Sequence, residues 1–118
     1  MTTYRNFVRT LYNAVDAKDT QALAELLHPD VSFVFSNSDP VKGIDSVLAI
    51  NAQFFTTIHS MSHSFYGIYE DGDDLMCDGQ VSYIRLDGTP HKANFATVLR
   101  LQDGLIREYR IYADLSGL

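Results

Sequence analysis

The sequence predicts an α+β fold, with three helices on one face of a curved antiparallel sheet. Apolar residues recur with the 3.6-residue period of a helix in the first half of the chain, and with the two-residue period of a strand from residue 61 onward. Segments rich in Asp and Gly, suited to hairpin turns, separate the later apolar runs. Helices that precede a set of hairpin-connected strands are typical of the α+β class.

The first half contains three predicted helices and one strand. The first helix can be capped by Thr2 or Thr3 and carries one apolar stripe, which consists of Tyr4, Phe7, Val8, Leu11, Tyr12 and Val15. Asp19 is the predicted N-cap of a short second helix, which the segment "HPD" ends. Alternating Val31, Phe33 and Phe35 predict a strand. The third helix covers residues 43–59, and Asn51 falls inside its apolar stripe together with Phe54 and other apolar residues.

The second half is predicted to form a four-stranded antiparallel meander. Its strands lie near residues 62–70, 74–86, 91–102 and 105–114, separated by "EDGDD", "DGTP" and "QDG". The early strand can join the edge of this meander. Apolar residues occur on both faces of the last two strands, with Phe95 and Leu99 on one face and Ala96 and Val98 on the other. Because one layer of helices buries a single face, we expect a homodimer through the outer face; a half-exposed sheet is the alternative.

Composition excludes several classes of function. With 118 residues we expect one domain over residues 1–118, and a formal net charge of −6 disfavours nucleic acid as a partner. No apolar stretch is long enough for a membrane span, and "MTTYRNFVRT" lacks the apolar core of a signal peptide, so we expect a cytoplasmic protein that binds no membrane. A single cysteine, Cys77, excludes an internal disulfide and a multi-cysteine zinc site, and it is expected to be a buried thiol.

The order of elements, together with "HPDVSF", "PVKG" and "QDGLIREYRIYAD", resembles the nuclear transport factor 2-like superfamily. This group includes ketosteroid isomerases, limonene-epoxide hydrolases, scytalone dehydratases and SnoaL-like polyketide cyclases. The resemblance implies a cone-shaped sheet whose concave face, covered by the helices, encloses an apolar pocket, and whose outer face commonly forms a dimer. It covers essentially the whole chain but leaves the function open, because function depends on the residues of the site.

The resemblance of "GTPHKANFATVLRLQDGLI" to ketosteroid isomerases sets an expected register for the sheet. In that register the residues that face the pocket are Phe33, Phe35, Gln80, Ser82, Ile84, Ala93, Phe95, Thr97, Tyr109, Ile111 and Ala113. The positions of the isomerase's base and second acid fall on Phe35 and Thr97, and its tyrosine position falls on Leu11, one residue before Tyr12. The epoxide hydrolase's catalytic aspartate position falls on Ile111. Neither mechanism is therefore expected.

His63 is the predicted catalytic residue. The segment "SHSFYGIYEDGD" is similar to a SnoaL-like pattern in which a histidine opens the second strand and faces the pocket, although Gly67 replaces the pattern's asparagine. Imidazole can act as a general acid or base at neutral pH. A histidine satisfied by a backbone carbonyl is the alternative. No carboxylate is expected on the inner face to fix the tautomer, which would leave His63 a modest base.

The remaining polar candidates are neutral. Asn51 could bond a ligand from the helical lid or instead bond a neighbouring loop, while Tyr109, Gln80, Ser82 and Thr97 could form an arc of donors around a small apolar ligand. The other residues expected to bind the ligand are Tyr12, Phe33, Phe35, Phe54, Phe95 and Ile111. His59 and His63 have the spacing of two metal ligands on a helix, but no third ligand is evident, so no metal and no cofactor are expected. Three hypotheses stay open: an isomerase- or cyclase-type enzyme that uses His63, a non-catalytic ligand-binding protein, and an interaction module that works through the outer sheet.

Overall fold

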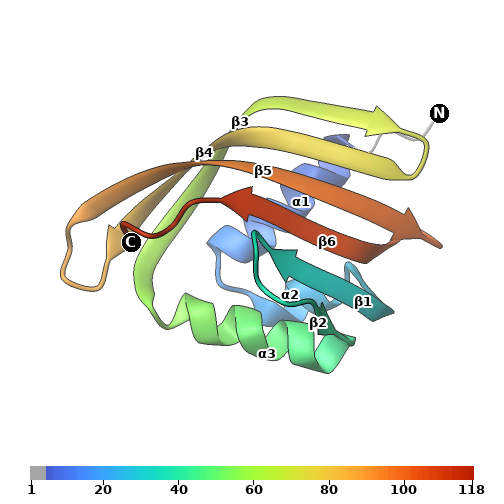
Figure 1. The fold of residues 1–118 in the computed structure, drawn as a ribbon, viewed down its shortest axis with the longest axis horizontal. Helices are drawn as coiled ribbons and strands as arrows, with labels where there is room; N and C mark the ends of the chain where they lie inside the picture. The colour runs from blue at the N-terminus through green and yellow to red at the C-terminus, as the bar shows by residue number, and fades with distance from the viewer. Residues whose placement is uncertain (1–4) are drawn as a thin grey trace.

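The computed structural model describes residues 5–118. The helices are α1 (Arg5–Asp16), α2 (Thr20–Ala24) and α3 (Ile44–Phe55), and the strands are β1 (Leu27–Phe35), β2 (Val41–Lys42), β3 (Ile58–Asp71), β4 (Asp74–Arg85), β5 (Pro90–Gln102) and β6 (Leu105–Ala113). The strands form one sheet in the order β2-β1-β6-β5-β4-β3 (Figure 1). The predicted α+β class is confirmed.

The sheet is mixed rather than wholly antiparallel. Strands β3 to β6 form the expected meander, but β1 pairs with β6 in parallel, with Phe33 beside Tyr109 and Phe35 beside Ile111. The short strand β2 was not predicted; two residues are too few for a periodic signal, and it pairs antiparallel to β1. The parallel pair matters for the site, because it brings two inward-facing rows of large side chains together.

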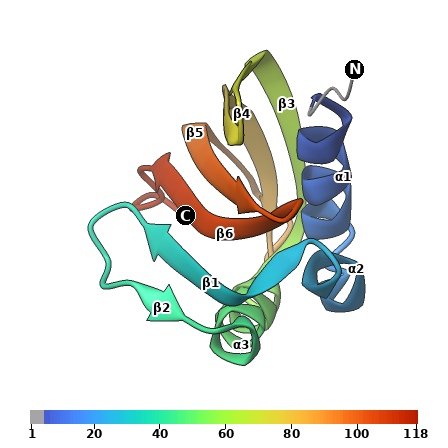
Figure 2. The same cartoon turned by 90° about the vertical axis from the view of Figure 1, so that its right-hand side faces the viewer.

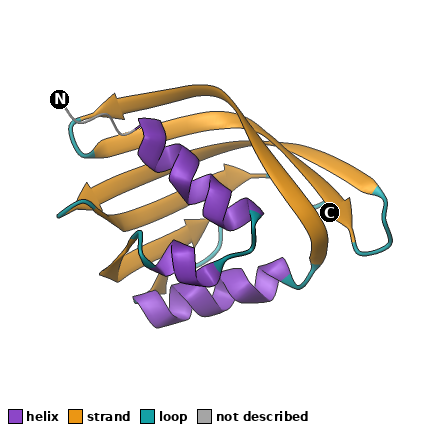
Figure 3. Cartoon of the chain, turned by 180° about the vertical axis from the view of Figure 1, so that it is seen from behind, coloured by secondary structure: helices purple, strands orange, loops and turns teal. Residues whose placement is uncertain are grey.

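The sheet curves around the helices and remains open at both edges. Helices α1 and α3 lie on its concave side (Figures 2 and 3). Val8, Leu11, Tyr12 and Val15 of α1 are buried as the helical stripe predicts. The residues expected to begin this helix, Thr2, Thr3 and Tyr4, lie outside the described residues.

Two element boundaries differ from the prediction. The segment "HPD" does not end a helix, because α2 stops at Ala24 and His28 to Asp30 belong to β1. Asp19 caps α2 as expected, accepting from the Ala22 backbone N–H at 3.0 Å. Helix α3 ends at Phe55 rather than near residue 59, because the Thr56 and Thr57 hydroxyls bond back to the carbonyls of its last turn and the chain then enters β3. His59 therefore lies on a strand.

The turn chemistry agrees with the sequence. Asp103 and Gly104, which join β5 to β6, both have positive φ, at 56° and 77°. Two successive positive-φ residues are characteristic of the two-residue hairpin turns that Asp-Gly favours. No helix within residues 5–118 is long and apolar enough to cross a membrane.

Candidate functional site

An apolar cavity of about 200 Å³ lies between the helices and the concave face of the sheet. Its wall contains no Lys, Arg, Asp or Glu among the described residues, and its polar groups come from Asn51, His63 and three tyrosines. The lining residues are Tyr12, Val15, Phe33, Phe35, Ile50, Asn51, Phe54, Phe55, Met61, His63, Val81, Tyr83, Phe95, Tyr109, Ile111, Ala113 and Leu115.

Most of the residues predicted to face the pocket meet at this cavity, although whether they bind a ligand stays a prediction. Those at the wall are Tyr12, Phe33, Phe35, Asn51, Phe54, His63, Phe95, Tyr109, Ile111 and Ala113, whereas Ala93 does not line the cavity. Thr97 is fully buried and lies behind Tyr12, so its hydroxyl supports the wall without forming part of it.

The prediction that Gln80, Ser82 and Ile84 point inward is wrong by one residue. The buried residues of β4 are Leu75, Cys77, Gly79, Val81 and Tyr83, whereas Gln80 and Ser82 are only partly buried. Because successive side chains of a strand point to opposite faces, this one-residue slip places both polar residues on the outer face. Val81 and Tyr83 take their places at the cavity.

His63 is paired with a carboxylate that the sequence analysis did not identify. Its Nδ1 lies 2.5 Å from Asp16 Oδ1, and its backbone N–H donates to Asp16 Oδ2 at 3.0 Å. The His63 side chain is 8% exposed and that of Asp16 is 25% exposed. Asp16 comes from the last turn of α1, so the expectation that no carboxylate would fix the tautomer of His63 is wrong. A carboxylate at Nδ1 favours the tautomer in which Nε2 is free to accept a proton.

Aromatic rings fix the orientation of the imidazole. The Tyr12 ring lies 4.3 Å from it between centroids, and the Phe95 ring meets it edge-on at 5.0 Å. Lys18 adds a further restraint, because its Nζ donates to the Ile58 and His59 carbonyls and so ties the start of β3 to the end of α1. His63 is thereby held on a rigid frame, as a catalytic or binding group must be.

The tyrosines around the cavity remain protonated well above neutral pH. Tyr12 and Thr97 share a buried hydrogen bond of 2.5 Å between their hydroxyls. Burial raises the pKa of Tyr12 and of Tyr109 well above the ordinary value of a tyrosine, and the nearby Cys77 thiol raises the pKa of both further. Burial raises the pKa of Tyr83 to about 12, with Asp16 adding to the effect. These hydroxyls are therefore neutral hydrogen-bonding groups, not bases.

Asn51 is 8% exposed and its side chain is oriented by its own helix. Its Nδ2 donates to the Val47 carbonyl at 2.9 Å. The alternative expectation, a bond to a neighbouring loop, is not what the structure has. The amide oxygen of Asn51 takes no part in this hydrogen bond.

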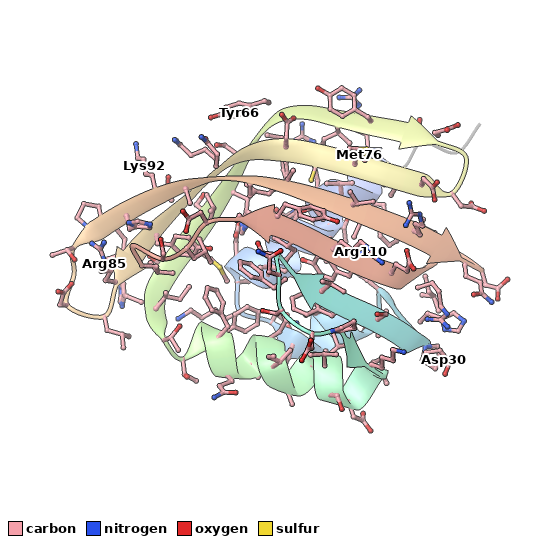
Figure 4. All side chains as sticks on the ribbon, viewed as in Figure 1. Asp30, Tyr66, Met76, Arg85, Lys92 and Arg110 are labelled. Carbon is pink, nitrogen blue, oxygen red and sulfur yellow. The ribbon has the colours of Figure 1, made fainter. Side chains whose placement is uncertain are left out.

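The C-terminal segment contributes to one side of the cavity through Leu115. Arg85 holds this segment, donating to the Gly117 carbonyl at 2.9 Å and to the Leu118 carbonyl at 3.4 Å. Figure 4 labels Arg85 near the hairpin between β4 and β5. The wall at this end thus depends on contacts between residues far apart in the sequence.

The spacing of His59 and His63 has no metal-binding consequence in this fold. Residues four apart are neighbours on a helix, but on a strand they are about 13 Å apart. His59 is exposed. Within residues 5–118 there is no group of three or more His, Cys, Asp or Glu side chains arranged to hold a metal ion.

A signal for Asp16 was present in the sequence. It follows Tyr12 by four residues, so both occupy the same side of α1, one turn apart. The helix had to be placed against the start of β3 before this carboxylate could be assigned to His63. The packing of α1 against β3 belongs to the tertiary structure, and the apolar stripe of the helix alone does not specify it.

Comparisons with known proteins agree with this architecture. A family model described as the SnoaL-like domain matches residues 8–109. Among curated proteins, none matches the chain.

Three solved structures illustrate the similarity. A protein from Jannaschia sp. CCS1 assigned as a SnoaL-like polyketide cyclase is 20% identical, with a TM-score of 0.84 over 95% of this chain and 85% of the other. A ketosteroid isomerase-like protein from Catenulispora acidiphila, solved with trimethylamine, is 21% identical, with a TM-score of 0.86 over 97% and 89%. A nuclear transport factor 2-like protein of unknown function from Burkholderia pseudomallei is 21% identical, with a TM-score of 0.86 over 97% and 92%. At these identities the likeness shows the fold alone.

Proposed function

Because the chain belongs to the SnoaL-like domain family, we propose that it is an acid–base enzyme of the isomerase or cyclase type, acting in the cytoplasm on a small hydrophobic or aromatic molecule. The observation that carries this proposal is the 2.5 Å contact between Asp16 and His63 beside an apolar cavity. The carboxylate holds the proton on Nδ1, and Nε2 is the atom that accepts a proton from the substrate. The same nitrogen returns the proton to another atom of the substrate, so that no external acid is consumed.

The apolar wall supports the catalytic assignment in two ways. A neutral substrate with a flat ring can pack against the aromatic side chains, and the exclusion of water strengthens every electrostatic interaction inside the cavity. The positive charge that develops on the imidazole is stabilised by Asp16, as in other carboxylate–histidine pairs. General acid–base catalysis of this kind contributes about 10²- to 10⁴-fold in rate.

A benzisoxazole provides a direct test, because it is compact, neutral and aromatic and reports a base without the natural substrate. A base removes its ring C–H proton, the N–O bond breaks, and a 2-cyanophenolate is released that can be followed by absorbance. We expect His63→Gln and Asp16→Asn to lower kcat by about 100-fold or more. His59→Gln, which changes an exposed histidine on the same strand, should leave the rate unchanged.

Two other outcomes would reject the enzymatic proposal. If the probe binds in the cavity but the wild type and His63→Gln react at equal rates, the protein is a ligand-binding member of the fold. If neither the probe nor a benzenediol of similar size binds at millimolar concentration, the cavity is not a binding site and the outer sheet becomes the better candidate.

We further propose that the outer face of the sheet pairs with a second copy of the chain. The outer patch, exposed on strands β3, β4 and β6, consists of Tyr66, Tyr69, Met76 and Tyr112, which are 67%, 59%, 49% and 47% exposed, with Ala96 and Val98 of β5 between them. Tyr66, Met76 and Arg110 are labelled in Figure 4. An exposed apolar patch of this kind is typical of an interaction surface.

Charge complementarity supports a second copy as the occupant. Asp78 and Arg110 carry opposite charges on the outer face, where Asp78 is partly buried and the Arg110 side chain is 39% exposed; within the described residues Arg110 Nε has a carboxylate, that of Glu108, only at 3.9 Å. Asp78 pairs with Ala96, and Arg110 pairs with Val98, so the two charges lie on opposite sides of β5. A two-fold axis lying over β5, between the two sheets, would place Asp78 of each copy against Arg110 of the other.

A further inference from the structure

We propose that the cavity selects a neutral ring compound that carries two hydrogen-bond donors, one directed at His63 and the other at Asn51. This proposal rests on the proposed function, because it names the class of molecule that the same site takes. Some polar atoms of the wall are already hydrogen-bonded within the protein, and the others are left for a ligand.

Asn51 presents an acceptor to the cavity. A carbonyl oxygen can be bonded only by a donor, so the contact with the Val47 carbonyl must be made by the amide nitrogen. This contact identifies the two ends of the amide, so Oδ1 is the end that is left for a ligand. Within residues 5–118 this oxygen accepts no hydrogen bond, although the side chain is 8% exposed and lines the cavity.

His63 presents a second acceptor. Its Nδ1 is engaged by Asp16 at 2.5 Å, and in the neutral imidazole this leaves Nε2 with a lone pair and no proton. The Tyr12 hydroxyl is engaged by the Thr97 hydroxyl and also interacts with that of Tyr109, so these two tyrosines are less available to a ligand than Asn51 and His63. The Tyr83 hydroxyl can donate or accept, so it does not discriminate between ligands.

The rest of the wall excludes charge and limits size. Because no Lys, Arg, Asp or Glu of the described residues lines the cavity, a charged ligand would lose its hydration without gaining a counter-ion. The volume of about 200 Å³ lies below the range of about 300–1,000 Å³ that is usual for drug-sized ligands, so the ligand must be compact. A ring with only acceptor groups would leave Asn51 Oδ1 and His63 Nε2 buried and unpaired. A ring with two hydroxyl or enol groups satisfies both.

The test replaces donors with fluorine, which is close to hydroxyl in size but donates no hydrogen bond. Each of the three benzenediol isomers is compared with the fluorophenol and the difluorobenzene of the same substitution pattern, and binding is followed by NMR titration of the cavity residues. For at least one pattern we expect affinity to fall about fivefold for each hydroxyl replaced, as for the loss of one neutral hydrogen bond. In Asn51→Leu, replacing one of the two hydroxyls should no longer lower the affinity, and the affinity for difluorobenzene should be unchanged.

Asn6→Leu is the matched control, since Asn6 is an exposed asparagine of α1 that lines neither this cavity nor the hollow on the other side of His63. Equal affinity of all three compounds in every pattern, or an unchanged preference in Asn51→Leu, would overturn the proposed donor selectivity while leaving the cavity as a binding site. No shift of the cavity resonances with any compound would reject both this proposal and the proposed function.

Discussion

Both oxygens of the Asp16 carboxylate engage His63. Oδ1 contacts the imidazole and Oδ2 accepts from the backbone N–H. Strand β3 lies at the edge of the sheet, so one row of its backbone donors has no neighbouring strand. Asp16 satisfies one of these donors and at the same time sets the imidazole tautomer, which couples the stability of the edge to the chemistry of the site.

This double contact predicts different effects for two substitutions. Asp16→Ala leaves the His63 backbone donor and Nδ1 without partners and should lower the free energy of unfolding by about 1–3 kcal/mol. Asp16→Asn keeps one acceptor and should lose less stability while still losing catalysis. Urea denaturation measures both, with Asp39→Asn in an exposed loop as the control. Equal stability of Asp16→Ala and the wild type would show that the contact is not made in solution.

Buried hydroxyl and thiol groups predict a loss of stability at alkaline pH. Burial raises the pKa of the Cys77 thiol from 9.0 to about 11 and that of Tyr83 from 10.0 to about 12. Between the unfolded and the folded pKa the unfolded chain has released the proton and the native chain has not, so stability falls as pH rises. Below pH 9 this contribution is fully present, and above it each such group removes at most about 1.4 kcal/mol per pH unit.

Denaturation curves measured from pH 8 to 11 test this expectation. Cys77→Val should make the free energy of unfolding fall less steeply above pH 9, and Tyr83→Phe should do the same above pH 10. Tyr66→Phe, at a tyrosine that is 67% exposed, should leave the profile of the wild type unchanged. A flat profile over this range would contradict the burial of these groups.

At the scale of single elements, β4 decides which side chains reach the cavity. Its inward row could have been recognised from the strand itself, because Leu75, Cys77, Val81 and Tyr83 are more apolar than the alternate row. The predicted inward row of β4 was instead set by the resemblance of β5 to a distant family. That register was shifted by one residue, which moves every side chain of the strand to the opposite face. The predicted inward residues of β1 and β6 line the cavity together with Phe95 of β5, and Thr97 is buried behind them, because the alternation of these strands agreed with that register; Ala93 does not line the cavity.

Gly79 is the residue that lets β3 and β4 approach each other. A Cβ at this position would lie 1.8 Å from the Ser64 carbonyl oxygen and 2.9 Å from the Phe65 Cα. Both contacts are with backbone, beside the irregularity in pairing between Phe65 and Gly67. Any side chain here must push β3 outward.

We therefore expect Gly79→Ala to lower the free energy of unfolding by about 1–3 kcal/mol. Because His63 pairs with Val81 two residues away, the same variant should also weaken catalysis. Ser82→Ala, a small change on the outer face of the same strand, should have little effect on either. Thermal unfolding and the benzisoxazole assay measure the two effects, and a Gly79→Ala protein as stable as the wild type would show that the strands are farther apart than described.

At the scale of the whole molecule, the order of helices and hairpins was sufficient to predict the fold class. Period changes and Asp-Gly turns are local signals, and they placed the ends of the four meander strands within four residues of the observed ends. The parallel pairing of β1 with β6 and the contact of Asp16 with His63 join segments that are distant in the sequence. Such contacts depend on how the elements pack, which the local pattern of apolar residues does not determine.

The outer patch gives a prediction for the assembly. We expect a homodimer at micromolar concentration, measured by size-exclusion chromatography with light scattering. Asp78→Arg or Arg110→Asp alone should place like charges together and give a monomer, and the two changes combined should restore the dimer, because each pair re-forms with its signs exchanged. A wild-type monomer would instead favour an interaction module with another protein as partner.

The proposed chemistry depends on Asp16 leaving the Nε2 of His63 as a free acceptor beside the cavity. The most direct measurement is the ¹⁵N–¹H correlation spectrum of the imidazole groups near pH 8, with the His63 signals assigned by comparison with His63→Gln. We expect the proton of His63 on Nδ1 in the wild type and on Nε2 in Asp16→Asn, whose amide can donate to Nδ1. If the proton of wild-type His63 is instead on Nε2, this nitrogen cannot accept a proton from a substrate, and His63 is not the base proposed here.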